Sequence, residues 1–395
     1  MPSRDAIVRV ALVGGPMYDP LYAAIPDFER ETGLTVEIVA KLPHPELNAL
    51  VKTWFSSGEA DIDLLSTHTK YAPSQAQWLA PITDELPLDV IADLLPRAAE
   101  LARIGGQLLQ VPRNLDVRLL HYRRDLVERV PESWTEVAEL SSALTRPGFY
   151  GFLFPGRDSG LFGTFYELLV GAGGVLFDET LRPAFDSKAG DWAVAMIAEL
   201  HNIRRVTPRQ LASWHYDEIS ASFRTGHAAM VCDWPGSYHL YTNPDTCRHA
   251  SQVGLALLPR GPAGLRAAYA GCHSFALPHG SRNPDGGAAL LRFLTSFDAQ
   301  LSEARRGAIP CRASALRRVR EETAANPEHA HRWELLADTE QFMIIPPRFA
   351  SYPLCEDAIW QSVQRAMVGE CSATEAVRQA TADIHAIVDA HVSAR

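Results

Sequence analysis

Several residues are of types that enzymes use in catalysis. Cys272 and His273 are adjacent in AYAGCHSFALP, and a thiol beside an imidazole suggests a nucleophile with its base. Neighbouring residues of a strand point to opposite faces, so these two side chains are not expected to pair with each other. A glycoside hydrolase would need two carboxylates about 5–10 Å apart across the scissile bond. The acids near the predicted ligand-binding segments are Asp19, Asp116, Asp158 and Asp233.

Motifs for other catalytic or metal sites are missing from the sequence. There is no nucleophile elbow, P-loop, HExxH or GxGxxG at a strand–helix junction. GAGG at 171–174 follows a helical pattern and is interpreted as a helix end. His68 has no second histidine at ligand spacing, and the two histidines of HAIVDAH (385–391) do not share a helical face. We therefore predict no catalytic residue, no metal site and no cofactor, and a protein that is not an enzyme.

The elements that must position any binding residues alternate in the first third of the chain. Strands are expected at 7–15, 34–42 and 61–66, with helices at 20–33 and 44–60 between them. This order predicts parallel strands with right-handed crossovers. Ligands of such sheets bind beyond the carboxyl ends of the strands. The candidate ligand contacts at these ends are Tyr18, His44, Thr67, His68 and Lys70.

The later part of the chain also alternates. Strands are expected at 108–111 and 117–122, joined by residues 112–114. Ser133 is a predicted N-cap whose capping box includes Glu136 three residues later. Further strands are expected at 148–156, 228–231 and 271–278, a strand followed by a turn at 253–264, and helices at 88–103, 283–297 and from about 313 onward. Since no low-complexity linker interrupts the chain, any two domains are expected to be joined by ordered strands.

Several motifs follow one another in an order that resembles a known family. FRTGHAAMVCDWPGSY (223–238) resembles the signature F..GkaAM...g.w, with His227 in place of the usual lysine. ADIDLLSTHTKYAPSQAQWLAPI (60–82) and LQVPRNLDVRLLHYRRDLVERVPESWTEV (109–137) resemble two further segments, and RGAIPCRASAL (306–316) fits the element G.lP.r. Together they cover almost the whole chain. The sequence resembles the family 1 extracellular solute-binding proteins, the maltose-binding-like receptors of ABC importers.

This resemblance implies an α/β, two-lobed periplasmic-binding-protein fold of type II. Each lobe would be a mostly parallel sheet flanked by helices, with crossing strands as a hinge and a ligand cleft between the lobes. The N-terminal lobe would comprise 1–112 and 260–312, and the C-terminal lobe 113–259 and 313–395. The implied function is to bind a small carbohydrate (a mono- or disaccharide, a polyol or an acidic sugar) and to deliver it, as a monomer, to membrane permease subunits.

The resemblance also suggests roles for residues around the cleft. Trp234 and Tyr238, on the turn with Gly236, would stack on the apolar face of a sugar. Gly271 would permit close backbone approach, and His273 would point into the cleft. The other candidate ligand contacts are Arg113, Asn114, Asp116, Gly156, Arg157 and Arg348.

The arginines raise a question about ligand charge. Arg113, Arg157 and Arg348 could converge on a carboxylate, phosphate or sulfonate, because guanidinium groups match the geometry of such anions. A neutral sugar could equally accept hydrogen bonds from arginine. We therefore expect a neutral carbohydrate or polyol first and an acidic sugar second.

Composition limits the partners and the compartment. The 395 residues carry a net charge of −10, which argues against nucleic acid and anionic membranes as partners. The N-terminal sequence lacks signal-peptide features, which fits either a cytoplasmic chain or one whose signal peptide has been removed. The resemblance implies the second, a periplasmic or extracellular chain associated with the membrane through the transporter. A cytoplasmic ligand sensor and a two-lobed carbohydrate-active enzyme are the alternatives. Free buried thiols are expected, although an oxidising compartment would favour a Cys232–Cys247 or Cys272–Cys311 bridge.

Overall fold

The chain divides into two compact units. The computed structural model describes residues 6–393, apart from 16, 84 and 87. Unit 1 comprises Met1–Asp116, Gly271–Ala330 and Arg348–Ala350, and unit 2 comprises Val117–Ala270, His331–Pro347 and Ser351–Arg395. Two of the boundaries fall inside strands, β6 (Val111–Val117) and β11 (Ala268–Ala276). The chain therefore passes from one unit to the other on ordered backbone, as the missing linker predicts.

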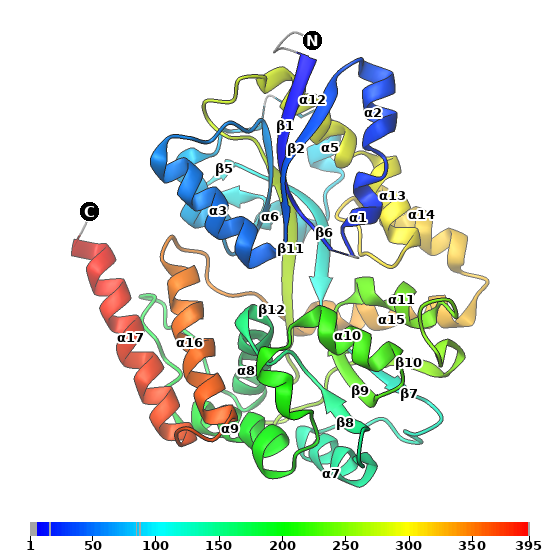
Figure 1. Cartoon of the computed structure of the whole chain (residues 1–395), viewed down its shortest axis with the longest axis vertical. Coiled ribbons are helices and arrows are strands. Elements are labelled where there is room, and N and C mark those ends of the chain that lie inside the picture. Colours follow the sequence, from blue (N-terminus) through cyan, green and yellow to red (C-terminus); the bar gives the residue numbers. More distant parts are fainter. Residues whose placement is uncertain (1–5, 16, 84, 87, 394–395) are drawn as a thin grey trace. The chain divides into compact units, whose positions relative to one another are not determined.

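Unit 1 is built on a sheet in which one strand runs against three parallel ones. β1 (Ile7–Val13) pairs in parallel with β2 (Thr35–Leu42) and β3 (Leu64–His68). β11 then pairs antiparallel with β3, and β6 is a further neighbour of β11 in the same sheet (Figure 1). This arrangement confirms the parallel order expected for the first three strands.

The core of unit 1 lies on both faces of this sheet. Val8, Val10 and Leu12 of β1 belong to one hydrophobic cluster, whereas Ala11 and Val13 belong to another. Successive side chains of a strand point to opposite faces, so a strand buried on both sides is mostly apolar, and Arg9 is the one charged residue of β1. The covering and connecting elements are α1 (Asp19–Tyr22), α2 (Ile25–Thr32), α3 (His44–Ser57), α4 (Ala72–Gln75), α5 (Leu88–Ala92), α6 (Pro96–Leu101), β4 (Arg103–Ile104), β5 (Gln107–Leu108), α12 (Pro284–Leu294), α13 (Phe297–Arg305) and α14 (Ala313–Thr323).

Unit 2 has a four-stranded sheet with a similar pattern of directions. Its strands are β10 (Val253–Ala256), β7 (Leu119–Arg123), β9 (Ala228–Asp233) and β8 (Tyr150–Leu153), in that order. β7 is antiparallel to both of its neighbours, while β8 and β9 are parallel. β7 therefore runs against the other three strands, just as β11 runs against β1, β2 and β3 in unit 1.

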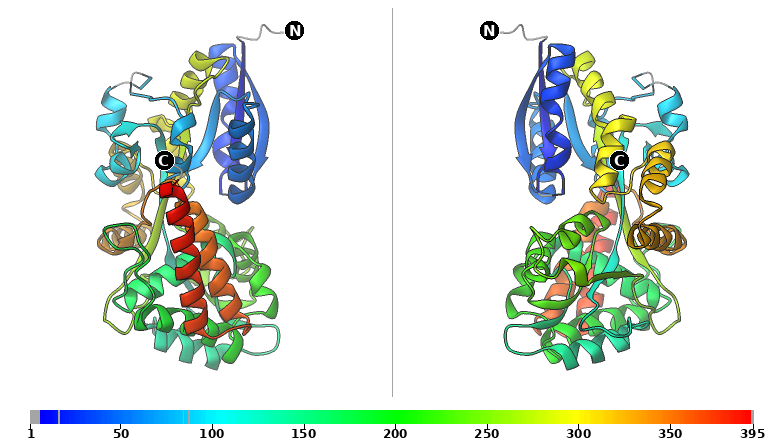
Figure 2. Two further views of the ribbon diagram at one scale, coloured as in Figure 1. Left: turned by 90° about the vertical axis from the view of Figure 1, so that its left-hand side faces the viewer. Right: turned by 90° about the vertical axis from the view of Figure 1, so that its right-hand side faces the viewer.

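Helices surround the sheet of unit 2. α16 and α17 run side by side in Figures 1 and 2, where they are orange and red, and α8 and α9 pack against α16. The helices of this unit are α7 (Trp134–Leu144), α8 (Asp158–Gly171), α9 (Lys188–Ala198), α10 (Tyr216–Arg224), α11 (Tyr238–Thr242), most of α15 (Pro327–Thr339), α16 (Tyr352–Met367) and α17 (Ala373–Ser393); the short strand β12 (Met343–Ile344) pairs with the start of β11.

Several element boundaries differ from those expected. The helix expected at 20–33 is two helices, α1 and α2, and it ends at Gly33 with φ 72° as its C-cap sequence predicts. Residues 112–114 were expected to join two strands, but they lie within β6. β11 begins at Ala268 rather than at Gly271. The N-cap prediction is confirmed, because Ser133 Oγ accepts a hydrogen bond from the backbone N of Glu136 at 3.2 Å.

Candidate functional site

Three histidines from different parts of the sequence meet in unit 1. His68 ends β3, His273 lies opposite it on β11, and His44 is the first residue of α3. Their ring centroids are 5.0 Å apart for His68 and His273, 4.9 Å for His44 and His273, and 5.3 Å for His44 and His68. All three residues were predicted as ligand contacts. We refer to these three residues as the histidine cluster.

A tyrosine and a carboxylate hold His273. The Tyr18 hydroxyl lies 2.9 Å from His273 Nε2, and their rings meet edge to face. Asp116 Oδ2 is 3.7 Å from the same nitrogen, and Asn114 donates a hydrogen bond to the other oxygen of Asp116 at 2.7 Å. Three further predicted residues, Tyr18, Asn114 and Asp116, therefore lie at the histidine cluster.

The imidazoles of His68 and His273 are electrically neutral over the ordinary pH range. Burial lowers the pKa of His68 well below its usual value, and the neighbouring His44 and Lys70 lower it further. Burial likewise lowers the pKa of His273 well below its usual value, and His68 and the cations Arg113 and Lys70 lower it further. A neutral imidazole has one donor and one acceptor nitrogen. His68 Nδ1 accepts from the backbone N of Lys70 at 3.2 Å, so its proton lies on Nε2.

Small and aromatic neighbours give the cluster its shape. A Cβ added at Gly271 would lie 2.5 Å from His68 Nε2, so only glycine leaves room for this imidazole. Tyr71 packs edge-on against His44 at 5.0 Å between ring centroids, and Lys70 Nζ lies 4.7 Å from the Tyr71 ring centroid. The predicted residues Gly271 and Lys70 thus also border the histidine cluster.

Thr67 supports this region from inside the unit. Its hydroxyl donates to Gln75 Oε1 at 2.7 Å, and Gln75 donates in turn to Asn48 at 2.9 Å. Thr67 lies within β3 and is buried. Its hydroxyl proton is therefore used in a chain of protein hydrogen bonds.

In unit 2, three aromatic rings lie next to one another. Trp234 follows β9 and is half-buried. Its ring centroid is 5.2 Å from that of Tyr216, the first residue of α10, and 5.8 Å from that of Tyr269 on β11. We refer to these three residues as the aromatic cluster. Planar apolar surfaces bordered by hydroxyl groups suit a ligand that has both C–H faces and hydroxyls.

A buried ion pair holds the aromatic cluster in position. Arg118 and Glu167, both fully buried, form an ion pair through the guanidinium Nη2 and Glu167 Oε2. Arg118 Nη1 donates to the Tyr216 hydroxyl at 3.3 Å, and Glu167 Oε1 accepts from the backbone N of Tyr269 at 2.8 Å. Two of the three aromatic residues are therefore attached to the same pair. The ring of Tyr269 also lies against Gly163 of α8, where a Cβ would come within 2.5 Å of it.

The other predicted residues of unit 2 lie in structural contacts. Tyr238 is buried, and the Arg332 guanidinium carbon is 5.0 Å from its ring centroid. The carbonyl of Gly236 is 2.6 Å from His239 Nδ1. A Cβ at Gly156 would collide with the Leu211 carbonyl. Trp234 therefore lies in the aromatic cluster, whereas Tyr238 packs with Arg332.

The three arginines are each engaged by the protein. Arg113 of β6 forms a buried ion pair with Glu303, which holds its pKa above the usual range against the opposing effect of burial. Arg157 Nη1 pairs with Asp158 at 2.6 Å. Arg348 donates to backbone carbonyls at the end of α6 and in β4, those of Leu101 and Arg103 at 2.9 Å each and that of Glu100 at 3.4 Å. Within unit 1, Arg113 and Arg348 hold different protein groups.

Tyr71, Tyr216 and Tyr269 were not predicted from the sequence. Tyr71 follows the predicted Lys70 directly, and Tyr269 is two residues before Gly271 on the same strand. Residues two apart on a strand share a face, which would have identified Tyr269 had the strand been expected to start earlier. Tyr216 gives no such signal, because its place depends on how α10 packs beside β9.

The adjacent cysteine and histidine point in different directions, as predicted. The His273 ring contacts Tyr18, whereas the Cys272 sulfur contacts Cys311. Among the residues that the structure describes, no group of three or more His, Cys, Asp or Glu side chains is arranged to hold a metal ion. Within the same part of the chain, none of the helices has the length and apolar character needed to span a bilayer.

Comparison with known proteins identifies the family. A family model for bacterial extracellular solute-binding proteins matches residues 23–331. The chain belongs to this family. Its members bind solutes, which confirms the prediction of a binding protein rather than an enzyme, and the family is extracellular, in agreement with the predicted compartment.

Two relatives and two solved structures illustrate the similarity of this solute-binding protein. A probable ABC transporter-binding protein of Deinococcus radiodurans is 24% identical over 300 residues, which is 72% of this chain and 71% of the relative. A mannitol-binding protein of Pseudomonas aeruginosa is 29% identical over 233 residues, or 55% of this chain and 52% of the relative. The match therefore spans about half the length of the second relative.

The solved structures confirm the fold class. Maltose-bound MalE3 of T. maritima has a TM-score of 0.88 and 26% identity, with 96% of this chain and 99% of that chain covered. A solute-binding protein of Agrobacterium vitis with bound D-mannitol has a TM-score of 0.82 and 22% identity, with 97% and 99% covered. The solute-binding protein therefore has the two-lobed type II fold that the resemblance implied.

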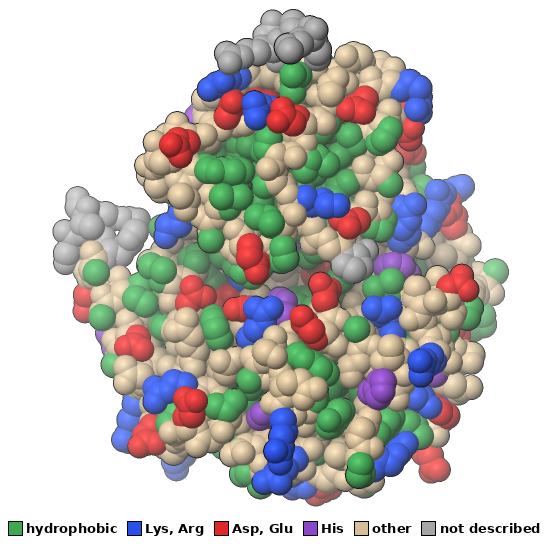
Figure 3. Space-filling view, in the orientation of Figure 1, with side chains coloured by type: hydrophobic (Ala, Val, Ile, Leu, Met, Phe, Trp, Pro, Cys, Tyr) green, Lys and Arg blue, Asp and Glu red, His purple; other side chains and the backbone are tan. Residues whose placement is uncertain are grey.

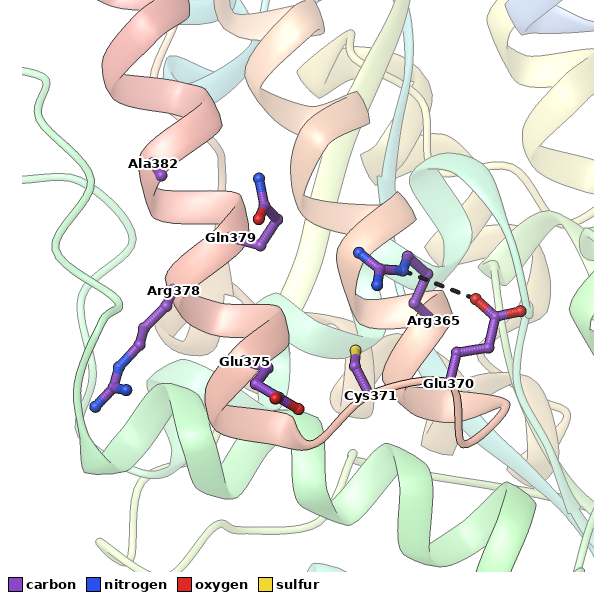
Figure 4. A pocket seen from close by; sticks show the side chains of 7 residues that line it. All are labelled: Arg365, Glu370, Cys371, Glu375, Arg378, Gln379 and Ala382. Carbon is purple, nitrogen blue, oxygen red and sulfur yellow. Dashed lines mark ion pairs between the residues drawn. The ribbon is translucent and has the colours of Figure 1, made fainter.

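A separate cavity of about 470 Å³ lies between α16 and α17 of unit 2 (Figure 4). Its lining residues are Arg365, Glu370, Cys371, Glu375, Arg378, Gln379 and Ala382. The two arginines are balanced by two glutamates, and Arg365 Nε lies 3.7 Å from Glu370 Oε2. The lining has no aromatic side chain, so this cavity lacks the planar surface of the aromatic cluster.

Proposed function

We propose that this solute-binding protein binds a small neutral carbohydrate or polyol and delivers it to the permease of an ABC importer. The observation that carries the proposal is the half-buried Trp234 between Tyr216 and Tyr269. Aromatic planes pack well against the C–H faces of sugars, and adjoining hydroxyl groups meet the sugar's own hydroxyls. The named ligands of similar proteins, maltose and D-mannitol, belong to the same chemical class.

The histidine cluster supplies the complementary chemistry. Sugar hydroxyls both donate and accept hydrogen bonds, and a neutral imidazole offers one nitrogen of each kind. Tyr18 and Asp116 hold His273, while Gly271 leaves the space that His68 occupies. We propose that residues of this cluster bind ligand hydroxyls. The predicted contacts Tyr18, His44, His68 and His273 are the ones that this proposal uses.

The charges favour a neutral ligand over an acidic sugar. Two of the arginines that could bind an anion already pair with carboxylates, Arg113 with Glu303 and Arg157 with Asp158, and Arg348 donates to three carbonyls. A paired guanidinium contributes little net attraction for a second anion. On the face shown in Figure 3, basic and acidic side chains are interspersed, and no basic patch gathers there.

The remaining parts of the proposal concern assembly. We propose that units 1 and 2 are the two lobes of the receptor, that the chain acts as a monomer, and that the permease subunits recognise the ligand-bound form. The support is the ABC transporter named in the Deinococcus relative. In the mature protein a signal peptide would have been removed. Light scattering on the purified chain, with and without ligand, would test the monomer.

A ligand screen tests the proposed function directly. The full chain would be heated with D-mannitol, ribitol, D-tagatose and maltose, and in parallel with gluconate and sugar phosphates. We expect neutral compounds to raise the melting temperature and to be recovered unchanged. The Trp234→Ala protein should lose the response, whereas Trp78→Ala, which removes a half-buried tryptophan stacked on Phe55, should keep it. Stabilisation by the anionic compounds alone, or conversion of a ligand, would overturn the proposal.

A further inference from the structure

Two cysteine sulfurs are in contact inside unit 1. Cys272 lies on β11 and Cys311 precedes α14, and their Sγ atoms are 3.8 Å apart. These are the two cysteines of this unit, and both are fully buried. The other four, all in unit 2, are Cys232, Cys247, Cys355 and Cys371. A sulfur–sulfur contact of this length is a van der Waals contact between two thiols.

The backbone on both sides of this contact is held firmly. The Cys272 carbonyl accepts from the backbone N of Thr69 at 3.1 Å, and the Cys311 carbonyl accepts from that of Leu95 at 2.8 Å. The residues flanking Cys311 form β-bridges of their own, Pro310 with Asn114 and Arg312 with Leu94. Forming a disulfide requires the sulfurs to approach to about 2.05 Å. Rotation about the Cα–Cβ bonds is the movement that would bring the two sulfurs together.

The compartment supplies the oxidising conditions. The family is extracellular, and disulfides form and persist outside the cytoplasm. We propose that Cys272 and Cys311 form an intrachain disulfide in the mature protein. The two thiols lose two protons and two electrons to a disulfide oxidant, which is reduced to two thiols, and one S–S bond forms between the protein sulfurs. The proposal does not depend on the identity of the ligand.

Burial determines when the bond can form. The attacking species in thiol–disulfide exchange is the thiolate. Burial raises the pKa of Cys311 well above its usual value, and the adjacent Cys272 raises it further. Once the unit has folded, the Cys311 thiol is neutral and both thiols are buried away from a bulky oxidant. The bond therefore forms while the chain folds, before β11 and the segment around Cys311 close over each other.

The crosslink joins parts of unit 1 that matter for the candidate site. It connects two positions 39 residues apart, a span that includes α12 and α13. Cys272 directly precedes His273, so the bond would anchor the backbone that carries one member of the histidine cluster. Closing a loop of this length restricts the unfolded chain and so stabilises the folded unit.

Refolding under two redox conditions tests the proposal. The full chain would be unfolded and reduced, then refolded either in a mixture of oxidised and reduced glutathione or in dithiothreitol. After glutathione we expect four of the six cysteines to react with a thiol reagent in denaturant, and a peptide linking Cys272 to Cys311 in a non-reducing digest. The oxidised protein should melt several degrees above the reduced one. Glutathione added to already folded, reduced protein should act far more slowly.

Matched variants make the result decisive. In Cys311→Ala, the glutathione and dithiothreitol samples should melt at the same temperature, because no bond can form. Cys355→Ala removes a fully buried cysteine of unit 2 and should keep the full difference. Six reactive thiols in the wild-type protein after refolding in glutathione would overturn the proposal, as would a different linked pair. The mapping on the wild-type chain decides the matter even if a variant fails to fold.

Discussion

The histidine cluster of unit 1 and the aromatic cluster of unit 2 are built on similar frames and present different chemistry. Each belongs to a unit whose sheet has a strand running against three parallel ones, and each lies near a buried arginine–glutamate pair. In unit 1 the Arg113 guanidinium lies 5.1 Å from the Tyr18 ring centroid, and in unit 2 Arg118 bonds to the Tyr216 hydroxyl. Unit 1 offers hydrogen-bonding imidazoles, whereas unit 2 offers aromatic planes.

A binding protein can contain buried arginines near its candidate site without attracting charged ligands. In both units a glutamate inside the protein neutralises the guanidinium group, and the guanidinium group in turn contacts a tyrosine at the candidate site. Specificity for hydroxyls would then come from neutral donors and acceptors in one unit, and affinity from planar contact in the other. The following predictions test whether one cluster supplies specificity and the other supplies affinity.

The largest loss of stability is expected when the Arg118–Glu167 ion pair of unit 2 is broken. Glu167→Gln leaves the Arg118 charge buried without a carboxylate, and such a loss costs roughly 3–5 kcal/mol. Glu303→Gln in unit 1 should cost less, because its pair keeps slight exposure, 4% and 7%, against 0% for both side chains of the unit 2 pair. Urea unfolding of the two variants measures the difference. An equal or larger loss in Glu303→Gln would contradict the ranking.

Ligand binding should depend more strongly on the aromatic cluster than on the histidine cluster. Trp234→Ala should weaken binding about 100-fold, or roughly 2.8 kcal/mol, as central aromatic contacts do. His273→Asn should cost about tenfold, the size of one hydrogen bond. Calorimetric titration with a ligand from the screen measures both. If His273→Asn proved the more damaging, unit 1 would be the main source of affinity.

The two close-packed glycines provide a smaller and more local test. Gly271→Ala would push His68 from its place, and Gly163→Ala would push the Tyr269 ring. Overpacking of this kind costs typically about 1–3 kcal/mol. Both variants should lose stability by similar amounts and lose ligand affinity as well. Gly33→Ala is the control at another glycine, since a Cβ there meets no neighbour and only the positive φ of a helix end is strained. Unchanged affinity in Gly271→Ala would exclude His68 from the site.

Acidification should affect the two units through different buried groups. Burial raises the pKa of Asp233 to about 6, so between the unfolded and folded pKa values the folded state holds a proton that the unfolded state lacks. Lowering the pH from 7 to 5 should therefore stabilise unit 2 by about 1 kcal/mol through Asp233 alone. His121 and His249 of the same unit, whose pKa values burial lowers to about 3 and about 4, act in the opposite direction. His68 and His273 have lowered pKa values, so protons bind the unfolded chain first and unit 1 loses stability below about pH 6.5.

Amide hydrogen exchange in β9 and β3, corrected for intrinsic rates, measures these two trends separately. Asp233→Asn serves as the control, because β9 of this variant should lose more protection on acidification than β9 of the wild type, while β3 should respond alike in both proteins. An equal change in β9 of the two proteins would contradict the assignment of the Asp233 shift.

Much of the fold was predictable from local pattern. The strand–helix alternation of residues 7–66 predicts β1, α3 and their neighbours, because a strand buried on both faces is mostly apolar. The cap at Ser133 depends on its side-chain oxygen, and the cap at Gly33 depends on a positive φ. Serine and glycine are the residue types that suit these two positions, so the sequence predicts both caps. The break between α1 and α2 and the inclusion of residues 112–114 in β6 were not predictable, since tertiary packing overrides short local signals there.

The candidate site was predictable in part. The strand-end rule led to Tyr18, His44 and His68, which the structure brings together with His273. It did not show that Arg113 is neutralised by Glu303, 190 residues away in the sequence, or that Tyr238 is buried while Tyr216 lies beside Trp234. Partners so distant in sequence leave no periodic signal in either segment.

The sequence by itself therefore determined the elements and the family. Hydrophobic periodicity, caps and the order of motifs are local properties, and each can be read within a few residues. Tertiary structure alone decided which side chains meet: three imidazoles from three elements, two aromatic residues attached to one ion pair, and two cysteine sulfurs in contact. These contacts depend on strand register and helix packing. A shift of one residue in register turns every side chain of a strand to the other face.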